Sequence, residues 1–208
     1  MWNLLVEPEG RSGAENMARD EALLDEVLRT GASFLRLYRF DPPCWSVGRN
    51  EPAIERAGVD VVRRPTGGRA VWHEHEVTYA VAAPLATFGR LRDAYRAIHE
   101  RLARALKSLG VDATLAADRQ TIRLTARPPA CFATTVGGEV LVAGRKVIGS
   151  AQVRRRDAFL QHGSILLDGS PDVVNATTLR DVLGRPVTFE EVADAIATAW
   201  DLAPLAAR

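Results

Sequence analysis

The order of apolar and polar residues predicts a small set of strands and helices. Residues 2–7 alternate as in a strand with one buried face, and residues 34–40 alternate between apolar and basic side chains, as in a half-buried strand. Residues 15–29 place their apolar side chains on one helical stripe. Further strands are expected at residues 44–48, 59–63 and 77–83, with three more runs between 138 and 168 forming an antiparallel meander. Further helices are expected at residues 91–109 and 188–200.

These elements do not alternate regularly along the chain. Strands precede and surround a few helices, which is typical of the α+β class, so we expect a mixed, largely antiparallel sheet with helices packed on one side. The length favours a single domain over residues 1–208. Its core would span residues 2–168, followed by a C-terminal helical segment over residues 170–208.

Composition mainly excludes classes of function. Hydrophobic residues make up 47% and charged residues 25%, which is ordinary for a globular protein, and the net charge of +1 gives no reason to expect a nucleic-acid partner. No apolar run approaches the roughly 18 residues that a membrane span needs. The first residues, MWNLLVEPEG, lack the pattern of a signal peptide, so we expect a cytoplasmic protein whose two cysteines are free thiols.

One stretch, residues 62–71 (VRRPTGGRAV), differs from this ordinary scaffold. Two arginines end an apolar strand, and the turn Thr66-Gly67-Gly68 follows at once. Glycine is used where the backbone adopts unusual angles or approaches a ligand closely. The turn matches neither the phosphate-binding loop GxxxxGK[ST] nor the dinucleotide pattern GxGxxG. By itself it indicates only a close approach, which an acyl group, its activated ester or thioester, or a phosphate would satisfy.

A second stretch, residues 144–167 (GRKVIGSAQVRRRDAFLQHGSILL), contains a lone lysine. Lys146 follows a turn glycine, and the period of a strand puts it on one face with Ile148, Ser150 and Gln152. A lysine there would pair with a carboxylate or polarise a carbonyl oxygen. The alternative is a hairpin lysine in solvent, where most lysines lie.

The two cysteines have different surroundings. Cys131 lies in the sequence ACF, between a proline-rich loop and a Gly-Gly turn. As a thiolate it would attack an acyl donor and carry the acyl group as a thioester. The alternative, a buried structural thiol, is the commoner fate of a free cysteine. Cys44, between Pro43 and Trp45, fits that structural description better.

Three histidines are candidates for chemistry. His73 and His75 are alternate residues, and in a strand they would share a face, which suits a metal ion. Since the sequence offers no clear third ligand, we expect no metal, with one of the two facing a pocket and the other exposed. His162 would donate a hydrogen bond, act as a base, or be a core histidine whose ring nitrogens are hydrogen-bonded.

Taken together, these segments resemble the lipoate and octanoate branch of the biotin/lipoyl protein ligase and transferase superfamily. The resemblance rests on RRPTGGRAVWHEHEVTYAV, a CF pair, GRKVIGSAQ and LQHGSILL in this order. The segments ENMARDEALL and LRLYRFDPPCWSVGRNE are similar to the family's first helix and following strands. The resemblance covers about residues 2–168. It implies a central mixed sheet flanked by helices, related to class II tRNA synthetase cores, with a pocket for a lipoyl or octanoyl tail.

The resemblance also implies roles for individual residues. Lys146 matches the family lysine that contacts the acyl carbonyl. The loop that walls the acyl pocket is matched by Arg64, Thr66, Gly67, Gly68, Arg69, Ala70 and His73. The lysine motif adds Gly149 and Ser150, and the motif that closes the other side of the pocket is matched by His162 and Gly163.

Two mechanisms share this scaffold. The family's ligases activate free lipoate with ATP through an acyl-adenylate, whereas its octanoyltransferases pass the chain to a cysteine and then to a lysine. One group of transferases resembles this chain in placing the cysteine in a Cys-Phe pair before the lysine motif, and Cys131 lies 15 residues before Lys146. The other group places it after the His-Gly motif, where this chain has no cysteine. Arg69, in place of the third loop glycine usual in ligases, also favours a transferase.

The resemblance therefore implies an octanoyltransferase that needs no cofactor. Its donor would be acyl carrier protein, and its acceptors lipoyl domains such as the glycine cleavage H protein or 2-oxoacid dehydrogenase E2. The alternatives are a lipoate ligase, which would use ATP and Mg, and a non-catalytic protein that binds the acyl carrier or lipoyl domains.

Overall fold

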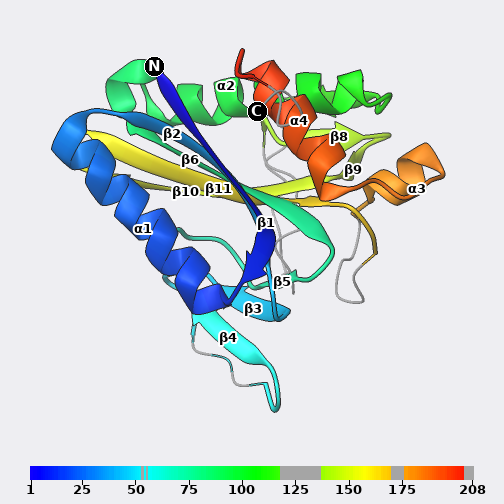
Figure 1. Cartoon of the computed structure of the whole chain (residues 1–208), viewed down its shortest axis with the longest axis horizontal. Helices are drawn as coiled ribbons and strands as arrows, with labels where there is room; N and C mark the ends of the chain where they lie inside the picture. The colour runs from blue at the N-terminus through cyan, green and yellow to red at the C-terminus, as the bar shows by residue number, and fades with distance from the viewer. Residues whose placement is uncertain (53, 55, 118–136, 170–175, 204–208) are drawn as a thin grey trace.

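The centre of the fold is a five-stranded sheet in the order β1-β2-β6-β11-β10 (Figure 1). The computed structural model describes the chain except residues 53, 55, 118–136, 170–175 and 204–208. The five strands are β1 (Trp2–Arg11), β2 (Ser33–Phe40), β6 (Glu76–Pro84), β10 (Ile148–Arg155) and β11 (Ala158–Leu166). Strand β1 is parallel to β2, and the other neighbouring pairs are antiparallel. The predicted α+β class with a mixed, largely antiparallel sheet is confirmed.

Two three-stranded sheets flank the central one. The first joins β4 (Asp60–Arg63), β3 (Cys44–Val47) and β5 (Val71–His73), and the second joins β7 (Ala113–Leu115), β8 (Val140–Val142) and β9 (Arg145–Lys146). The expected meander between 138 and 168 is therefore divided between two sheets. Lys146 ends β9, whereas Ile148 begins β10, so the predicted single strand carrying Lys146, Ile148, Ser150 and Gln152 is interrupted at Val147.

The helices begin and end where the sequence provides caps. The helices are α1 (Gly13–Thr30), α2 (Leu91–Ser108), α3 (Leu179–Leu183) and α4 (Phe189–Ala199), with a short 3₁₀ turn at Leu85–Thr87. Ser12 and Glu15 form a reciprocal capping box at the start of α1, and Gly31 ends it with φ at 73°. Thr188 and Glu191 form the same box on α4. Among the described residues, none of the helices is both long and apolar enough for a membrane crossing.

Helices cover both faces of the central sheet, so the expected one-sided arrangement is wrong (Figure 1). The cause is visible along β6, where alternate residues enter two different cores. Tyr79 and Val81 pack in the larger core with the apolar faces of α2 and α4, whereas Ala80 and Ala82 pack with α1. A strand that is apolar on both faces needs cover on both.

Candidate active site

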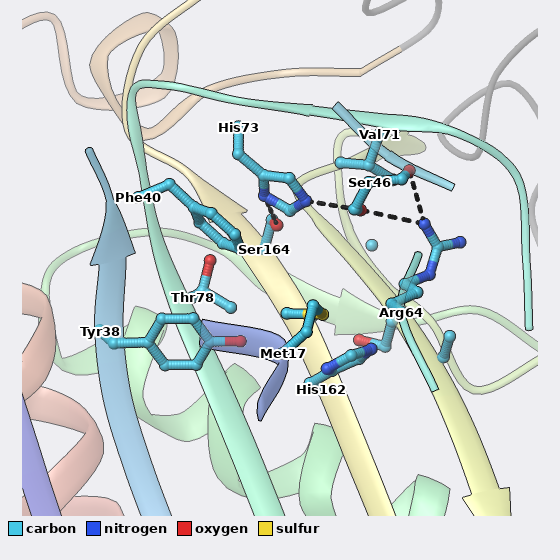
Figure 2. A pocket seen from close by; sticks show the side chains of 14 residues that line it. Met17, Tyr38, Phe40, Ser46, Arg64, Val71, His73, Thr78, His162 and Ser164 are labelled. Atoms are coloured by element: carbon cyan, nitrogen blue, oxygen red, sulfur yellow. Dashed lines mark hydrogen bonds between the residues drawn. The ribbon is translucent and has the colours of Figure 1, made fainter. Parts of the chain in front are cut away.

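A pocket opens on the α1 side of the central sheet, beside the β4-β3-β5 sheet (Figure 2). Its lining residues are Met17, Tyr38, Phe40, Ser46, Arg64, Val71, His73, Thr78, Gly149, Ser150, Ala151, His162, Gly163 and Ser164. Apolar side chains of α1, β2 and β5 make part of the wall, and hydroxyl, imidazole and guanidinium groups make the rest. Such a lining suits a ligand with an apolar tail and a polar head.

The structure gathers many of the predicted site residues around this pocket, although some lie behind its wall. Those that line it are Arg64, His73, Gly149, Ser150, His162 and Gly163. Five further predicted residues belong to the adjoining turn and are not among the described residues that line the pocket: Thr66, Gly67, Gly68, Arg69 and Ala70. Lys146 is also absent from the lining, and Cys131 lies outside the described residues.

Arg64 braces the turn that follows it. Its Nε and Nη2 donate to the carbonyl oxygen of Gly67 at 3.0 and 2.8 Å, and Nη2 also donates to that of Arg69 at 2.6 Å. Its Nη1 reaches the carbonyl oxygen and the hydroxyl of Ser46 in β3 at 2.9 and 3.1 Å. The guanidinium therefore fixes the turn against the sheet.

Two glycines allow backbone to approach backbone next to the pocket. A Cβ added at Gly48 would lie 2.0 Å from the carbonyl oxygen of Gly68, so the turn can rest on β3's end only because residue 48 has no side chain. A Cβ at Gly163 would lie 2.3 Å from the carbonyl oxygen of Gly149 on the neighbouring strand. Gly48 and Gly163 thus allow close packing of the backbone beside the pocket.

His162 links three parts of the chain. Its Nδ1 lies 2.8 Å from Asp20 Oδ2 of α1, and its Nε2 lies 2.7 Å from Thr66 Oγ1 in the turn. Burial lowers the pKa of His162 below its ordinary value, although the hydrogen bond and charge of Asp20 act in the opposite direction. At neutral pH the ring is therefore uncharged and joins the turn to α1.

His73 and His75 separate as expected. His73 is buried and lines the pocket, whereas the side chain of His75 is 55% exposed. Among the described residues there is no group of three or more His, Cys, Asp or Glu side chains placed to hold a metal ion.

Lys146 forms a buried ion pair whose partner the sequence did not identify. Its Nζ lies 2.6 Å from Glu139 Oε1, and the two side chains are 2% and 4% exposed. Glu139 lies just before β8, so the pair joins both ends of a tight hairpin. The prediction of a solvent-exposed lysine is excluded, and pairing with a carboxylate is observed.

Cys44 has the properties of a structural thiol. It is fully buried in β3, where it packs in the core beneath α1. Burial raises the pKa of the Cys44 thiol to about 12, and Glu76 and Asp60 add to the rise. A thiol with that pKa supplies almost no thiolate at neutral pH.

The chain matches the model of a known protein family. The model of the lipoyl protein ligase A/B catalytic domain matches residues 12–201. This chain belongs to that family. The predicted resemblance is confirmed.

Members of the lipoyl protein ligase A/B family give the match more detail. The octanoyltransferase LipM of Kyrpidia tusciae is 39% identical over 236 aligned residues, which cover 94% of this chain and 84% of the relative. A crystal structure of lipoate-protein ligase A bound with ATP is 21% identical and has a TM-score of 0.75, covering 97% of this chain and 86% of the other. A bipartite lipoate protein ligase of Thermoplasma acidophilum, described with its E2 lipoyl domain, is 19% identical with a TM-score of 0.67, covering 97% and 83%. The two structures show the shared fold.

Within this lipoyl ligase family fold, the motif residues have partners that no motif in the sequence identifies. Glu139 holds Lys146, Asp20 holds His162, and Ser46 and Glu76 flank His73. One signal was available for Asp20, which is a charged residue on the buried stripe of α1 between Met17 and Leu24. Ser46 and Glu76 carry no comparable signal, since strand pairing brings them to His73.

Replacing Arg64 with lysine should loosen the turn of this family loop. One ammonium cannot reproduce the fork that joins Ser46, Gly67 and Arg69, so buried carbonyl oxygens lose donors. We expect the free energy of unfolding, measured in urea, to fall by about 1–3 kcal/mol. Arg29→Lys is the control. The Arg29 side chain is 71% exposed and pairs with Glu26 of its own helix, so its change should stay within about 0.5 kcal/mol. Equal losses in the two variants would contradict the bracing role.

Proposed function

We propose that this protein is an octanoyltransferase that moves an octanoyl group from acyl carrier protein to the target lysine of lipoyl domains, through a thioester on Cys131. The observation that carries the proposal is the 39% identity to an octanoyltransferase LipM over 94% of the chain. The Cys131-Phe132 pair before the lysine motif agrees with it. Proposed acceptors are the glycine cleavage H protein and 2-oxoacid dehydrogenase E2. The bipartite ligase described with an E2 lipoyl domain supports acceptors of this class.

The chemistry needs two acyl transfers and no activation by a nucleotide. Cys131 attacks the thioester carbonyl of the donor, the donor thiol leaves, and the acyl group becomes a thioester of the enzyme. The amine of the acceptor lysine then attacks that carbonyl and releases Cys131. Exchange of one thioester for another, followed by amide formation, is downhill, so neither ATP nor a metal ion is required. We place the reaction in the cytoplasm.

The pocket and Lys146 would divide the work of binding. Apolar side chains such as Met17, Phe40 and Val71 would hold the octanoyl tail, with about 0.8 kcal/mol for each buried CH₂. Lys146 and backbone N–H groups would hold the carbonyl oxygen as negative charge develops on it. Arg64, Thr66, Gly67, Gly68, Arg69 and Ala70 would form the wall that fixes this geometry.

An intact-mass experiment tests the proposal. The protein is incubated with octanoyl carrier protein without ATP, and we expect a gain of one octanoyl group. The adduct should be absent from Cys131→Ser, whereas Cys44→Ala should keep it, because the Cys44 thiol is buried with a raised pKa. Lipoate-dependent release of pyrophosphate from ATP and Mg, with no adduct, would support the ligase instead. Absence of both activities would leave a protein that only binds acyl carriers or lipoyl domains.

A further inference from the structure

Four polar side chains form a continuous chain of hydrogen bonds at one wall of the pocket, and Figure 2 shows three of them, Arg64, Ser46 and His73. Arg64 Nη1 lies 3.1 Å from Ser46 Oγ, and Ser46 Oγ lies 2.7 Å from His73 Nε2. His73 Nδ1 is hydrogen-bonded in turn to Glu76 Oε1. Each of these residues is buried, and Arg64, Ser46 and His73 line the pocket. Hydroxyl, imidazole and carboxylate thus occur in the order that activates hydroxyls in acyl-transfer enzymes.

The two ends of this chain fix the tautomer of a neutral His73. A guanidinium can only donate, so Ser46 Oγ accepts from Arg64. A carboxylate oxygen accepts, so His73 Nδ1 donates to Glu76 Oε1. In that tautomer His73 Nε2 carries no proton, and Ser46 Oγ donates to it. The tautomer is assigned from these partners.

The imidazole of His73 is held on all sides. Its ring stacks on Phe40 with centroids 4.0 Å apart, and Ser164 Oγ lies 3.4 Å from Nδ1. Thr78 Oγ1 donates to Glu76 Oε1 at 2.8 Å and fixes the carboxylate. A base held in this way has its acceptor nitrogen in place before a substrate arrives.

The chain through His162 has the same order of groups but a different position. Thr66, His162 and Asp20 repeat the pattern of hydroxyl, imidazole and carboxylate. However, Thr66 is fully buried and, within the described part of the chain, does not line the pocket. Asp20 is further bound by Arg36 and Tyr38 of β2. The chain through His162 therefore serves architecture, whereas the chain through His73 presents its hydroxyl to the pocket.

We propose that Ser46, His73 and Glu76 are a proton relay that takes the proton of the acceptor lysine in the second acyl transfer. The inference rests on the proposed function. The ammonium group of the lysine gives one proton to Ser46 Oγ while the proton of Ser46 passes to His73 Nε2. The neutral amine then attacks the carbonyl carbon of the Cys131 thioester, an N–C bond forms, the C–S bond breaks, and the second proton of the nitrogen goes to the leaving sulfur of Cys131. The imidazolium, stabilised by Glu76, releases its proton to solvent.

The second transfer needs a base more than the first does. From ordinary pKa values, about one thiol in 30 is ionised at pH 7, whereas only about one lysine amine in 2,500 is unprotonated. A relay at the pocket wall removes the larger of these two barriers. In this relay Ser46 is the catalytic residue, because it takes the proton directly from the lysine nitrogen, whereas Glu76 acts through His73 as a positioning residue.

Single-turnover kinetics of the two transfers test the relay. Octanoyl carrier protein is mixed with wild type, Ser46→Ala and Glu76→Gln to measure acylation, and each acyl-enzyme is then mixed with a lipoyl domain at several pH values. We expect acylation to change by less than about tenfold and transfer to the lysine to slow by about 10²–10⁴-fold at pH 7. The deficit should shrink as the pH rises toward about 10, where the amine loses its proton unaided.

Ser108→Ala is the control, because it removes a hydroxyl that only bonds its own helix carbonyl, that of Ala105. Equal slowing of both transfers with no dependence on pH would reduce the relay to a structural contact and overturn the proposal. An octanoyl ester found on Ser46 in the Cys131→Ser variant would also overturn it, by making Ser46 a nucleophile. Variants that transfer at the wild-type rate contradict the relay alone, whereas a wild type that forms no thioester contradicts the proposed function and with it the relay.

Discussion

Lys146→Met is expected to lower the rate constant of acyl transfer by about 10²–10³-fold and the free energy of unfolding by about 3–5 kcal/mol. The first effect follows if the ammonium group helps to hold the carbonyl oxygen of the acyl group. The second follows from the observed ion pair, because the variant leaves the Glu139 carboxylate buried without the cation that lies 2.6 Å away. Activity and stability therefore fall together in this variant.

A double substitution separates these two effects. Replacing a buried ion pair with apolar side chains of similar size is often neutral for stability, whereas removing one partner is costly. The variant Glu139→Leu with Lys146→Met should therefore recover most of the unfolding free energy that Lys146→Met loses. Its transfer rate should stay about 10²–10³-fold below wild type, since the ammonium is still missing.

The measurements are urea unfolding followed by circular dichroism and single-turnover transfer from octanoyl carrier protein. Recovery of both stability and rate in the double variant would show that Lys146 is only a structural cation. Glu139→Gln provides a further check, because it keeps the lysine and removes the charge of its partner. A slower rate and a lower free energy of unfolding are expected there, since the ammonium stays buried without the charge of Glu139 that holds it in place.

The sequence predicted those parts of the fold that depend on local patterns. Helix α2 was placed within one residue of its observed end, and the capping boxes of α1 and α4 explain why their ends were also near. Helix ends are predictable because caps and apolar periods lie within a few neighbouring residues. That the Thr-Gly-Gly turn and His162 lie at one pocket was implied by the family resemblance, and Thr66 Oγ1 lies 2.7 Å from His162 Nε2.

The contacts that complete the site depend on the pairing of strands, which local sequence patterns do not specify. They could not be predicted in the same way. Ser46 meets His73 because β3 pairs with β5, a register that no local pattern specifies. Glu139 reaches Lys146 only because β8 and β9 form a sheet separate from the central one. The strand at 34–40, with its alternating apolar and basic residues, was also predicted to be half-buried, yet Arg36 is fully buried beneath α1.

Substitution of Arg36 should also have a large effect on the free energy of unfolding. Arg36→Met is expected to lower the free energy of unfolding by about 3–5 kcal/mol. Arg36 Nη1 lies 2.8 Å from Asp20 Oδ1, and Nη2 lies 2.8 Å from Glu7 Oε2. Its guanidinium carbon also lies 3.8 Å from the centre of the Tyr38 ring. Without this cation, the carboxylates of Glu7 and Asp20 would remain close together with less charge compensation.

Arg155→Met is the matched control, because Arg155 pairs with Asp25 while the two side chains are 42% and 66% exposed. An exposed pair contributes about 0–1 kcal/mol, so the control should unfold close to wild type in urea. Similar losses of unfolding free energy in both variants would show that burial does not determine how much the ion pairs of Arg36 with Asp20 and Glu7 stabilise the protein.

The pH dependence of the same measurement gives an independent check on Arg36. Burial raises the pKa of Glu7, but hydrogen bonds from Arg36 and Arg19 outweigh it and leave that pKa below the ordinary 4.5. A carboxyl whose pKa is lowered by folding stabilises the protein above its unfolded pKa, and this contribution disappears as the pH falls through the folded value. Arg36→Met removes part of this lowering of the Glu7 pKa. The variant therefore loses less unfolding free energy than wild type as Glu7 is protonated. The difference in unfolding free energy between wild type and Arg36→Met should therefore narrow as the pH falls from 4.5 toward the lowered pKa of Glu7.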